Sequence, residues 1–243
     1  MACESRPRRL VRALWGETAP GTRGPKPTLN VDDVVVRAVE LADRDGLGAV
    51  SMRSLARSLG YSTMALYTYV ATRDDLISVM LDHAMAELTA EPVPDGSWRE
   101  QVEALARRNW EWCLRHPWVL EQEHLRTGLG PNELAAAEQM LGVLSEGLAG
   151  ADAVLTWQAL TSFVRGSARR VLAAADGGGW DGAWWEDAVG AFEEIVPDPS
   201  ERFPVLTRLR AEGAFDGDGG DYLEFEARRA FEHGLARLLD GLR

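Results

Sequence analysis

The sequence predicts an all-α protein in which a small unit of three helices precedes a larger helical domain. Apolar residues recur at the spacing of helix faces along most of the chain, glycine and proline separate these segments, and no apolar–polar alternation is long enough for a strand. Apolar residues make up 46% of the 243 residues, so a substantial core is available. We expect about nine or ten helices.

The first 91 residues divide into an arm and a helical unit. Residues 1–28 are rich in Arg, Gly and Pro, so we expect a basic, largely flexible arm with at most a short helix over Arg8–Trp15. Residues 29–91 contain four short segments with helical periodicity, three for the unit itself and one for a connecting helix. Each begins near a good N-cap residue, at Asn30, Ser51, Ser62 and Thr72.

The second domain is expected over residues 92–243. It begins with Pro92–Gly96, whose proline and glycine content is typical of a boundary. The segment from Pro197 to Gly220 is expected to be a loop, because the same residue types punctuate it. Helices are predicted over residues 97–115, 132–148, 152–175, 184–195 and 221–241.

The uneven distribution of charge indicates where a polyanion would bind. The net charge is −12, yet residues 1–31 carry six Arg or Lys and two Glu, and residues 46–73 carry three Arg and no acid. Residues 92–243 hold 15 basic and 26 acidic residues. DNA would therefore meet the first quarter of the chain, whereas the acidic remainder would repel it.

Several other classes of protein are disfavoured. No apolar run approaches the roughly 18 residues that span a bilayer. Arg12 interrupts the only apolar stretch of the basic N-terminus, so we expect no secretory signal and a cytoplasmic protein. Cys3 and Cys113 are too few for a disulfide framework or a cysteine metal site.

The segment Ser51–Arg73 has the pattern of a helix-turn-helix. Ala56 is small enough for two helices to approach closely, and Gly60 permits the positive φ of a tight turn. The side chains predicted to lie between the two helices are Leu55, Leu59, Tyr61 and Leu66. The polar side chains of the second helix then face outward, toward a major groove. An ordinary helical hairpin fits this spacing equally well, and the absence of acid favours DNA binding.

Three motifs occur in this region in fixed order: A-x-x-L-A-D-x-x-G-L at Ala38–Leu47, S-M-R-x-L-A-x-x-L-G at Ser51–Gly60 and L-Y-x-Y-V at Leu66–Val70. Together they resemble the N-terminal domain of the TetR (tetracycline-repressor-like) family of transcriptional regulators. Residues 115–118, 163–166 and 231–241 resemble segments of the branch with a TetR-type C-terminal domain. The leading arm resembles extensions found in actinobacterial members.

This resemblance implies a repressor that binds a palindromic operator in double-stranded DNA as a homodimer. The implied DNA-facing residues are Arg53, Ser62, Thr63, Met64, Ala65, Tyr67, Thr68, Tyr69 and Arg73. Arg53 would reach a base, most simply a guanine by a bidentate contact, while Tyr67 and Arg73 would hold phosphates. From charge alone, additional backbone contacts are expected from Arg8, Arg9, Arg12 and Lys26 of the arm.

The resemblance also implies a small-molecule effector that binds among helices of the second domain. The implied ligand-binding residues are Trp110, Cys113, His116, Trp118, His124, Trp157 and Phe163. Such a lining suits a hydrophobic or aromatic molecule, and an ordinary core or surface role is the alternative for each side chain. We expect neither a metal nor a cofactor, because Phe163–Arg169 holds no acid where the resemblance would require a metal ligand.

Two helices are candidates for the dimer interface. Their apolar stripes contain Leu160, Val164 and Val171 in the first and Phe231, Leu235, Leu238 and Leu239 in the second. Burial against the same chain explains these stripes equally well. The four-helix interface implied by the family resemblance favours a symmetric homodimer.

An enzyme and a protein-binding helical adaptor are the alternatives. Glu121, Glu123, His116 and His124 lie close in sequence, but they contain a single unpaired Glu-x-x-His. No nucleophile or phosphate-binding loop stands in a recognisable context, so we expect no catalytic activity. The basic, acid-free helix-turn-helix disfavours an adaptor that does not bind DNA.

Overall fold

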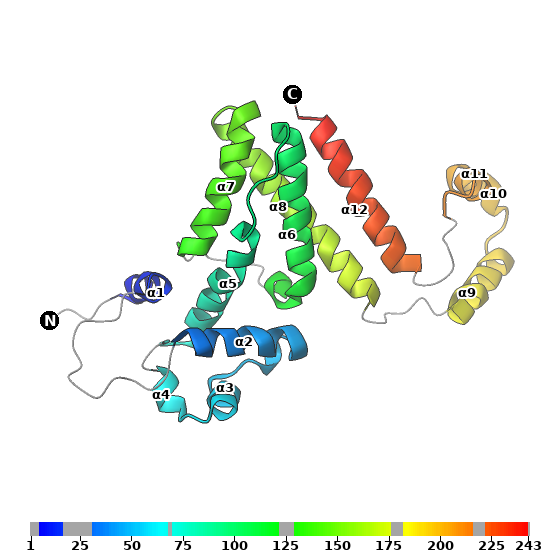
Figure 1. The fold of residues 1–243 in the computed structure, drawn as a ribbon. Coiled ribbons are helices and arrows are strands. Elements are labelled where there is room, and N and C mark those ends of the chain that lie inside the picture. The colour runs from blue at the N-terminus through cyan, green and yellow to red at the C-terminus, as the bar shows by residue number, and fades with distance from the viewer. Residues whose placement is uncertain are drawn as a thin grey trace, which may run out of the picture. The chain divides into compact units, whose positions relative to one another are not determined.

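The computed structural model describes residues 5–16, 31–67, 70–121, 129–175, 182–215 and 222–242. Within these ranges all regular structure is helical, and no strand occurs (Figure 1). This confirms the predicted all-α class.

The described part of the chain contains twelve α-helices and two short 3₁₀ helices. The first half comprises α1 (Arg6–Leu14), α2 (Val31–Asp45), η1 (Leu47–Ala49), α3 (Met52–Leu59), α4 (Thr63–Tyr67), α5 (Arg73–Thr89) and α6 (Trp98–Arg115). The second half comprises η2 (Pro117–Glu121), α7 (Pro131–Gly147), α8 (Ala151–Ala175), α9 (Gly182–Ile195), α10 (Pro199–Arg202), α11 (Pro204–Ala211) and α12 (Tyr222–Asp240).

The segment after α9 differs from the expected loop because it contains α10 and α11. Pro199 and Pro204, which suggested a loop, each stand at the beginning of one of these helices. Proline is favourable there, since its fixed φ suits a helix and its missing N–H would have no partner inside the helix. The prolines that suggested a loop therefore begin two short helices in this segment.

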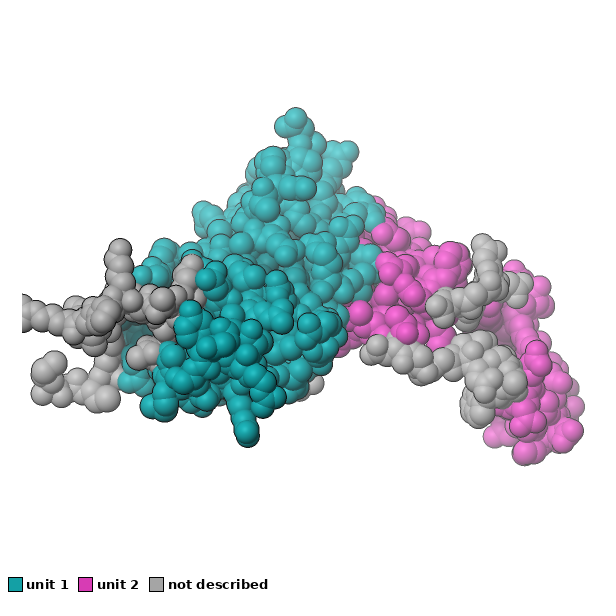
Figure 2. All heavy atoms as spheres, turned by 60° about the horizontal axis from the view of Figure 1, so that its bottom comes forward, with its two compact units in different colours: residues 1–165, 242–243 teal, residues 166–241 magenta. Residues whose placement is uncertain are grey.

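The chain forms two compact units, residues 1–165 with 242–243 and residues 166–241, which Figure 2 shows in teal and magenta. In the first unit, α5 packs against α2, α6 and α7. Because α5 follows α4 directly, it connects the N-terminal helices to α6 and α7. The expected boundary at residue 92 lies inside this first unit.

The unit α2–α4 is organised by the signals that its sequence predicts. The hydroxyls of Ser51 and Ser54 each accept a hydrogen bond of 3.0 Å from the other residue's backbone N–H, which forms a capping box at the start of α3. Gly60 ends α3 with a φ of 73°, the positive value predicted for the turn. Leu55 and Leu66 are buried as predicted.

The prediction that Tyr61 packs between the helices is wrong, because this residue is exposed. Its backbone N–H donates to the carbonyl of Ala56 at 2.9 Å, the hydrogen bond that closes the turn after α3. Tyr61 therefore belongs to the turn and not to the packed face.

Asp82 of α5 provides the N-terminal cap of α7. Its carboxylate accepts hydrogen bonds from the backbone N–H groups of Asn132 at 3.1 Å and Glu133 at 2.9 Å, and from the Asn132 side-chain amide at 3.1 Å. A carboxylate is favourable there because the first N–H groups of a helix lack partners within it. Gly130 is required beside this cap, since a Cβ on it would lie 2.0 Å from Asp82 Oδ1. Asp82 thus fixes α7 to α5.

Candidate DNA interface and effector region

The second helix of the helix-turn-helix, α4, presents a largely exposed face. Met64 and Tyr67 are 76% and 46% exposed, whereas Leu66 is buried against α3. Thr63 and Ala65 are partly exposed, and Ser62 before the helix is exposed. Thr68 and Tyr69, two further predicted DNA-facing residues, lie outside the described residues.

The supporting helix α3 adds positive charge beside α4. Arg53 is exposed, as a DNA-contacting residue requires. Arg57 is also exposed and lies one helical turn after Arg53. From the sequence we considered its charge and did not name it as a DNA contact, although the spacing of four residues places both arginines on one side of α3. We call the exposed and partly exposed set Arg53, Arg57, Ser62, Thr63, Met64, Ala65 and Tyr67 the recognition surface.

Arg73, predicted to hold a phosphate, makes two internal hydrogen bonds. Its guanidinium donates to the carbonyl of Val50 at 2.9 Å and to that of Leu47 at 2.7 Å. These bonds tie the start of α5 to η1, which connects α2 to α3. Arg73 is nevertheless exposed, so it combines a structural role with access to the solvent.

The N-terminal helix α1 attaches to the first unit at both of its ends. Arg6 Nε donates to Asp75 at the start of α5 over 2.9 Å. At the other end Leu14 is buried, and Trp15 Nε1 donates to the carbonyl of Leu129, just before α7, at 2.9 Å. The short helix expected in the arm is thus present, and it begins and ends near its predicted bounds.

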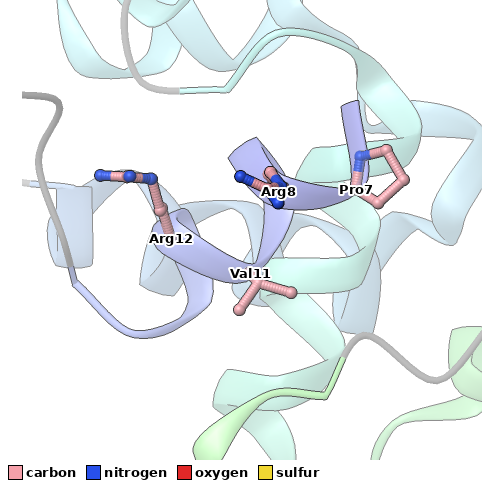
Figure 3. A pocket seen from close by; sticks show the side chains of 4 residues that line it. All are labelled: Pro7, Arg8, Val11 and Arg12. Atoms are coloured by element: carbon pink, nitrogen blue, oxygen red, sulfur yellow. The ribbon is translucent and has the colours of Figure 1, made fainter. Parts of the chain in front are cut away.

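Among the basic residues of α1 expected to contact DNA, Arg8 and Arg9 are exposed and Arg12 is partly exposed. Pro7, Arg8, Val11 and Arg12 line an open hollow along this helix (Figure 3). Lys26, the fourth basic residue predicted for DNA contact, lies outside the described residues.

The residues predicted to bind the effector fall into two groups. Trp110 and Cys113 are buried on α6, and Trp157 and Phe163 are partly exposed on α8. His116 and Trp118 form hydrogen-bonding contacts with Asp43 of α2. His124 lies outside the described residues.

Asp43, near the end of α2, is the shared partner of His116 and Trp118. Its Oδ1 atom lies 2.7 Å from His116 Nδ1 and accepts a hydrogen bond of 2.7 Å from Trp118 Nε1. His116 caps the C-terminus of α6, and Trp118 stands in η2. Both side chains are buried, so one carboxylate of α2 is held by two residues of the second predicted domain.

Glu87 of α5 contacts the same histidine from its other side. His116 Nε2 lies 3.1 Å from Glu87 Oε1, and Arg115 donates to Glu87 Oε2 at 2.9 Å. Partial burial of Glu87 opposes its negative charge, but the hydrogen bonds from Arg115 and His116 outweigh it and hold the pKa of Glu87 below its ordinary value of 4.5. The ionised carboxylate is therefore the form that fits this site.

The residues predicted for the dimer interface are mostly buried within a single chain. The buried members are Leu160, Val164, Val171, Phe231, Leu235 and Leu239. Leu238 is 39% exposed. Other large apolar side chains on the same helices are exposed, among them Val154 and Leu155 of α8 and Phe225 of α12.

The described residues contain neither a cluster suited to a metal ion nor a helix suited to cross a membrane. No group of three or more His, Cys, Asp or Glu side chains there is arranged to hold a metal ion. No helix among them has the length and apolar character needed to cross a membrane.

An exposed, basic helix-turn-helix followed by a larger helical region defines a DNA-binding regulator of transcription. The sequence model of the tetracyclin repressor-like C-terminal domain matches residues 91–243. The HTH-type transcriptional repressor DrrR1 of Streptomyces coeruleorubidus is 36% identical over 241 residues, covering 96% of this chain and 84% of the repressor. An HTH-type transcriptional regulator of Saccharopolyspora erythraea is 32% identical, covering 95% and 91%.

Solved structures agree with these relatives. ActR of Streptomyces coelicolor, a TetR family protein crystallised with actinorhodin, matches with a TM-score of 0.70 and 29% identity, over 88% of this chain and 95% of ActR. The complex of ActR with (S)-DNPA matches with a TM-score of 0.69 and 28% identity, over 90% and 98%. The chain belongs to the TetR family of transcriptional regulators.

Proposed function

We propose that the protein binds a palindromic operator as a homodimer, with one α4 helix in each of two successive major grooves. The observation that carries this proposal is the recognition surface, which is exposed and lies in a stretch, residues 46–73, that contains no acid. The half-sites are then about one helical turn apart. Because such an operator lies on the chromosome, the protein acts in the cytoplasm.

The recognition surface divides by chemistry into base-reading and phosphate-binding parts. Arg53 donates to a guanine in the major groove, and Thr63, Met64 and Ala65 meet base edges and thymine methyl groups. Arg57 and Tyr67 of this surface, together with Arg73 at the start of α5, bind phosphates and so fix the position of α4 without reading sequence. The exposure of Met64 and Tyr67 supports these roles, since neither side chain is needed for the core.

The dimer forms through the faces of α8 and α12 that the single chain leaves exposed. Leu155 of α8 is 61% exposed, and Phe225 and Leu238 of α12 are also exposed. The buried stripe residues on these helices support the fold of each subunit. A second copy of the chain would bury these exposed apolar residues on both helices.

The effector is a hydrophobic or aromatic small molecule that binds beside α6 and α8 and releases the protein from its operator. Trp110 and Cys113 of α6 and the partly exposed Trp157 and Phe163 of α8 support this assignment. The complexes of ActR with actinorhodin and with (S)-DNPA support a small molecule as the class of effector. We do not assign His116 and Trp118 to the effector site, because both side chains contact Asp43.

Fluorescence anisotropy with a labelled duplex tests the DNA-binding part. The duplex carries the inverted repeat upstream of the protein's own gene, and a scrambled duplex of the same length serves as reference. The wild type is expected to bind the repeat at least about a thousandfold more tightly than the scrambled duplex. The variant Arg53→Ala loses most of this preference, whereas Arg208→Ala, which removes an exposed arginine of α11, retains it.

Equal affinity for the two duplexes contradicts the proposal. A chain that binds no DNA but captures another protein through α8 or α12 would instead be the adaptor considered above. Addition of actinorhodin to the bound complex tests the effector class directly, because release of the duplex at micromolar concentrations identifies a ligand that this chain shares with ActR.

A further inference from the structure

The contact between α2 and the residues after α6 is concentrated on one carboxylate. We call the residues Asp43, His116 and Trp118 the joint. His116 Nδ1 and Trp118 Nε1 each lie 2.7 Å from the same oxygen, Asp43 Oδ1. Short contacts from a charged acceptor to buried N–H groups are strong and directional. A shift of α2 relative to α6 and η2 therefore breaks both contacts together.

The surroundings of the joint keep it rigid. The centroid of the His116 ring lies 5.9 Å from that of the Trp112 ring and 6.3 Å from that of the Trp118 ring. Trp112 Nε1 in turn donates to the carbonyl of Ala84 in α5 at 2.9 Å. Because Glu87 of α5 contacts the remaining nitrogen of His116, the joint ties α2, α5, α6 and η2 at one place.

The joint also connects to α8, one of the two helices assigned to the dimer. Arg165 of α8 donates to the carbonyl of Val119 in η2 at 2.8 Å. Val119 is buried and follows Trp118 directly in the chain. Two hydrogen bonds, joined by the backbone between Trp118 and Val119, therefore connect α8 through η2 to Asp43 of α2.

We propose that Asp43, His116 and Trp118 are positioning residues that set the half-site spacing accepted by the dimer. The inference rests on the proposed function, because only a dimer on a palindrome has a spacing to select. In a dimer joined through α8, the separation of the two recognition surfaces depends on how each α2–α4 unit is held relative to α8. One base pair changes the half-site separation by about 3.4 Å, so a rigid joint discriminates between neighbouring spacings.

The variants follow from this geometry. Asp43→Ala removes the acceptor shared by both contacts. Trp118→Phe retains a buried aromatic ring, smaller than the indole, and removes the N–H donor. Asp45→Ala is the matched control, because it removes the same charge from the same helix at a surface position, where the carboxylate pairs with the neighbouring Arg44.

Affinity is measured by fluorescence anisotropy for operators with the native spacing, with one base pair added or removed, and for a single half-site. At a wrong spacing one half-site loses its base contacts, so the wild type and Asp45→Ala are expected to bind the altered operators at least about tenfold more weakly. Asp43→Ala is expected to bring this ratio to within about threefold of one, and Trp118→Phe to an intermediate value. Affinity for the single half-site stays within about twofold, because the recognition surface is unchanged.

A folded Asp43→Ala protein with the wild-type spacing ratio overturns the inference. If Asp43→Ala does not fold, as its thermal transition would reveal, Trp118→Phe decides the same question: a reduced ratio supports the inference, and the wild-type ratio overturns it. A wild type that prefers no inverted repeat at all contradicts the proposed function instead, so the two failures are distinguishable.

Discussion

The recognition surface and the joint use similar residue types for opposite purposes. Met64 and Tyr67 project from α4 and are exposed, and Arg53 and Arg57 are exposed on α3. In the joint, His116 and Trp118 are buried and are held by Asp43. The difference shows that an aromatic or basic side chain is a candidate for binding DNA where the fold leaves it exposed, and a structural contact where the fold buries it.

The polar contacts of Asp82, of Arg73 and of the joint all connect one helix to another. Asp82 fixes α7 to α5, Arg73 fixes α5 to η1, and the joint fixes α2 to η2 and α6. Changes in these contacts should therefore alter stability or helix positions. Changes in the recognition surface should alter DNA affinity and leave stability unchanged. The following variants test this separation.

The largest expected effect is the loss of the cap that Asp82 provides. Asp82→Ala leaves two backbone N–H groups at the start of α7 without their acceptor and should lower the free energy of unfolding by about 3 kcal/mol. Chemical denaturation measures this loss. Asp82→Asn, which retains an oxygen acceptor, should lose less. A decrease below about 0.5 kcal/mol in Asp82→Ala would show that the carboxylate does not stabilise the α5–α7 contact.

The recognition surface is expected to behave in the opposite way. Arg53→Ala should weaken operator binding by about 2 kcal/mol, or roughly thirtyfold, because a bidentate contact with guanine is lost. Its thermal unfolding should match the wild type, since Arg53 is exposed. Anisotropy and thermal unfolding on the same preparation measure both quantities. Loss of stability with unchanged affinity would reverse the assigned roles of the two regions.

A smaller and mixed effect is expected at Arg73, which combines contacts inside the fold with the proposed phosphate binding. Arg73→Lys preserves the positive charge but cannot reproduce both hydrogen bonds to Leu47 and Val50. The free energy of unfolding should fall by about 1 kcal/mol, with operator affinity within about twofold. Unchanged stability together with weaker binding would mean that the guanidinium acts on DNA and not on η1.

The smallest effect concerns acid stability at Glu87. Its pKa lies below the ordinary value of 4.5, so its ionised form stabilises the folded state above that pH, and this contribution disappears as the pH falls through the lowered value. Glu87→Gln should therefore flatten the decline of stability below about pH 4.5. Glu111→Gln, on an exposed part of α6, is the control. Identical acid profiles for the wild type and Glu87→Gln would contradict the assignment.

Local signals allowed the sequence to predict the helical fold and the helix-turn-helix. Ser51 and Gly60 act through neighbours within a few residues, so their capping and turning roles are visible in the sequence. Tyr61 shows the limit of periodicity, because a hydrogen bond of the turn places it outside the packed face. Pro199 and Pro204 show that proline in a segment expected to be a loop can instead begin a helix.

Contacts between distant residues were not predictable in this way. The family resemblance implied a ligand-binding role for His116 and Trp118, whereas Asp43, the carboxylate that they contact, lies more than 70 residues earlier. Likewise, the charge of Arg6 does not reveal that Asp75 is its partner. No local pattern encodes such pairings, since they arise only when α1 packs against α5 and α2 against η2.

Methylation interference on the operator tests the central claim most directly, because it reports major-groove contact at single guanines. We predict one guanine in each half-site at which methylation of N7 prevents binding of the wild type, with the two positions about one helical turn apart. Arg53→Ala should lose this sensitivity, and Arg208→Ala should retain it. The same interference pattern in the wild type and Arg53→Ala, or no interference in either, would contradict the assignment of α3 and α4 as the DNA-reading surface.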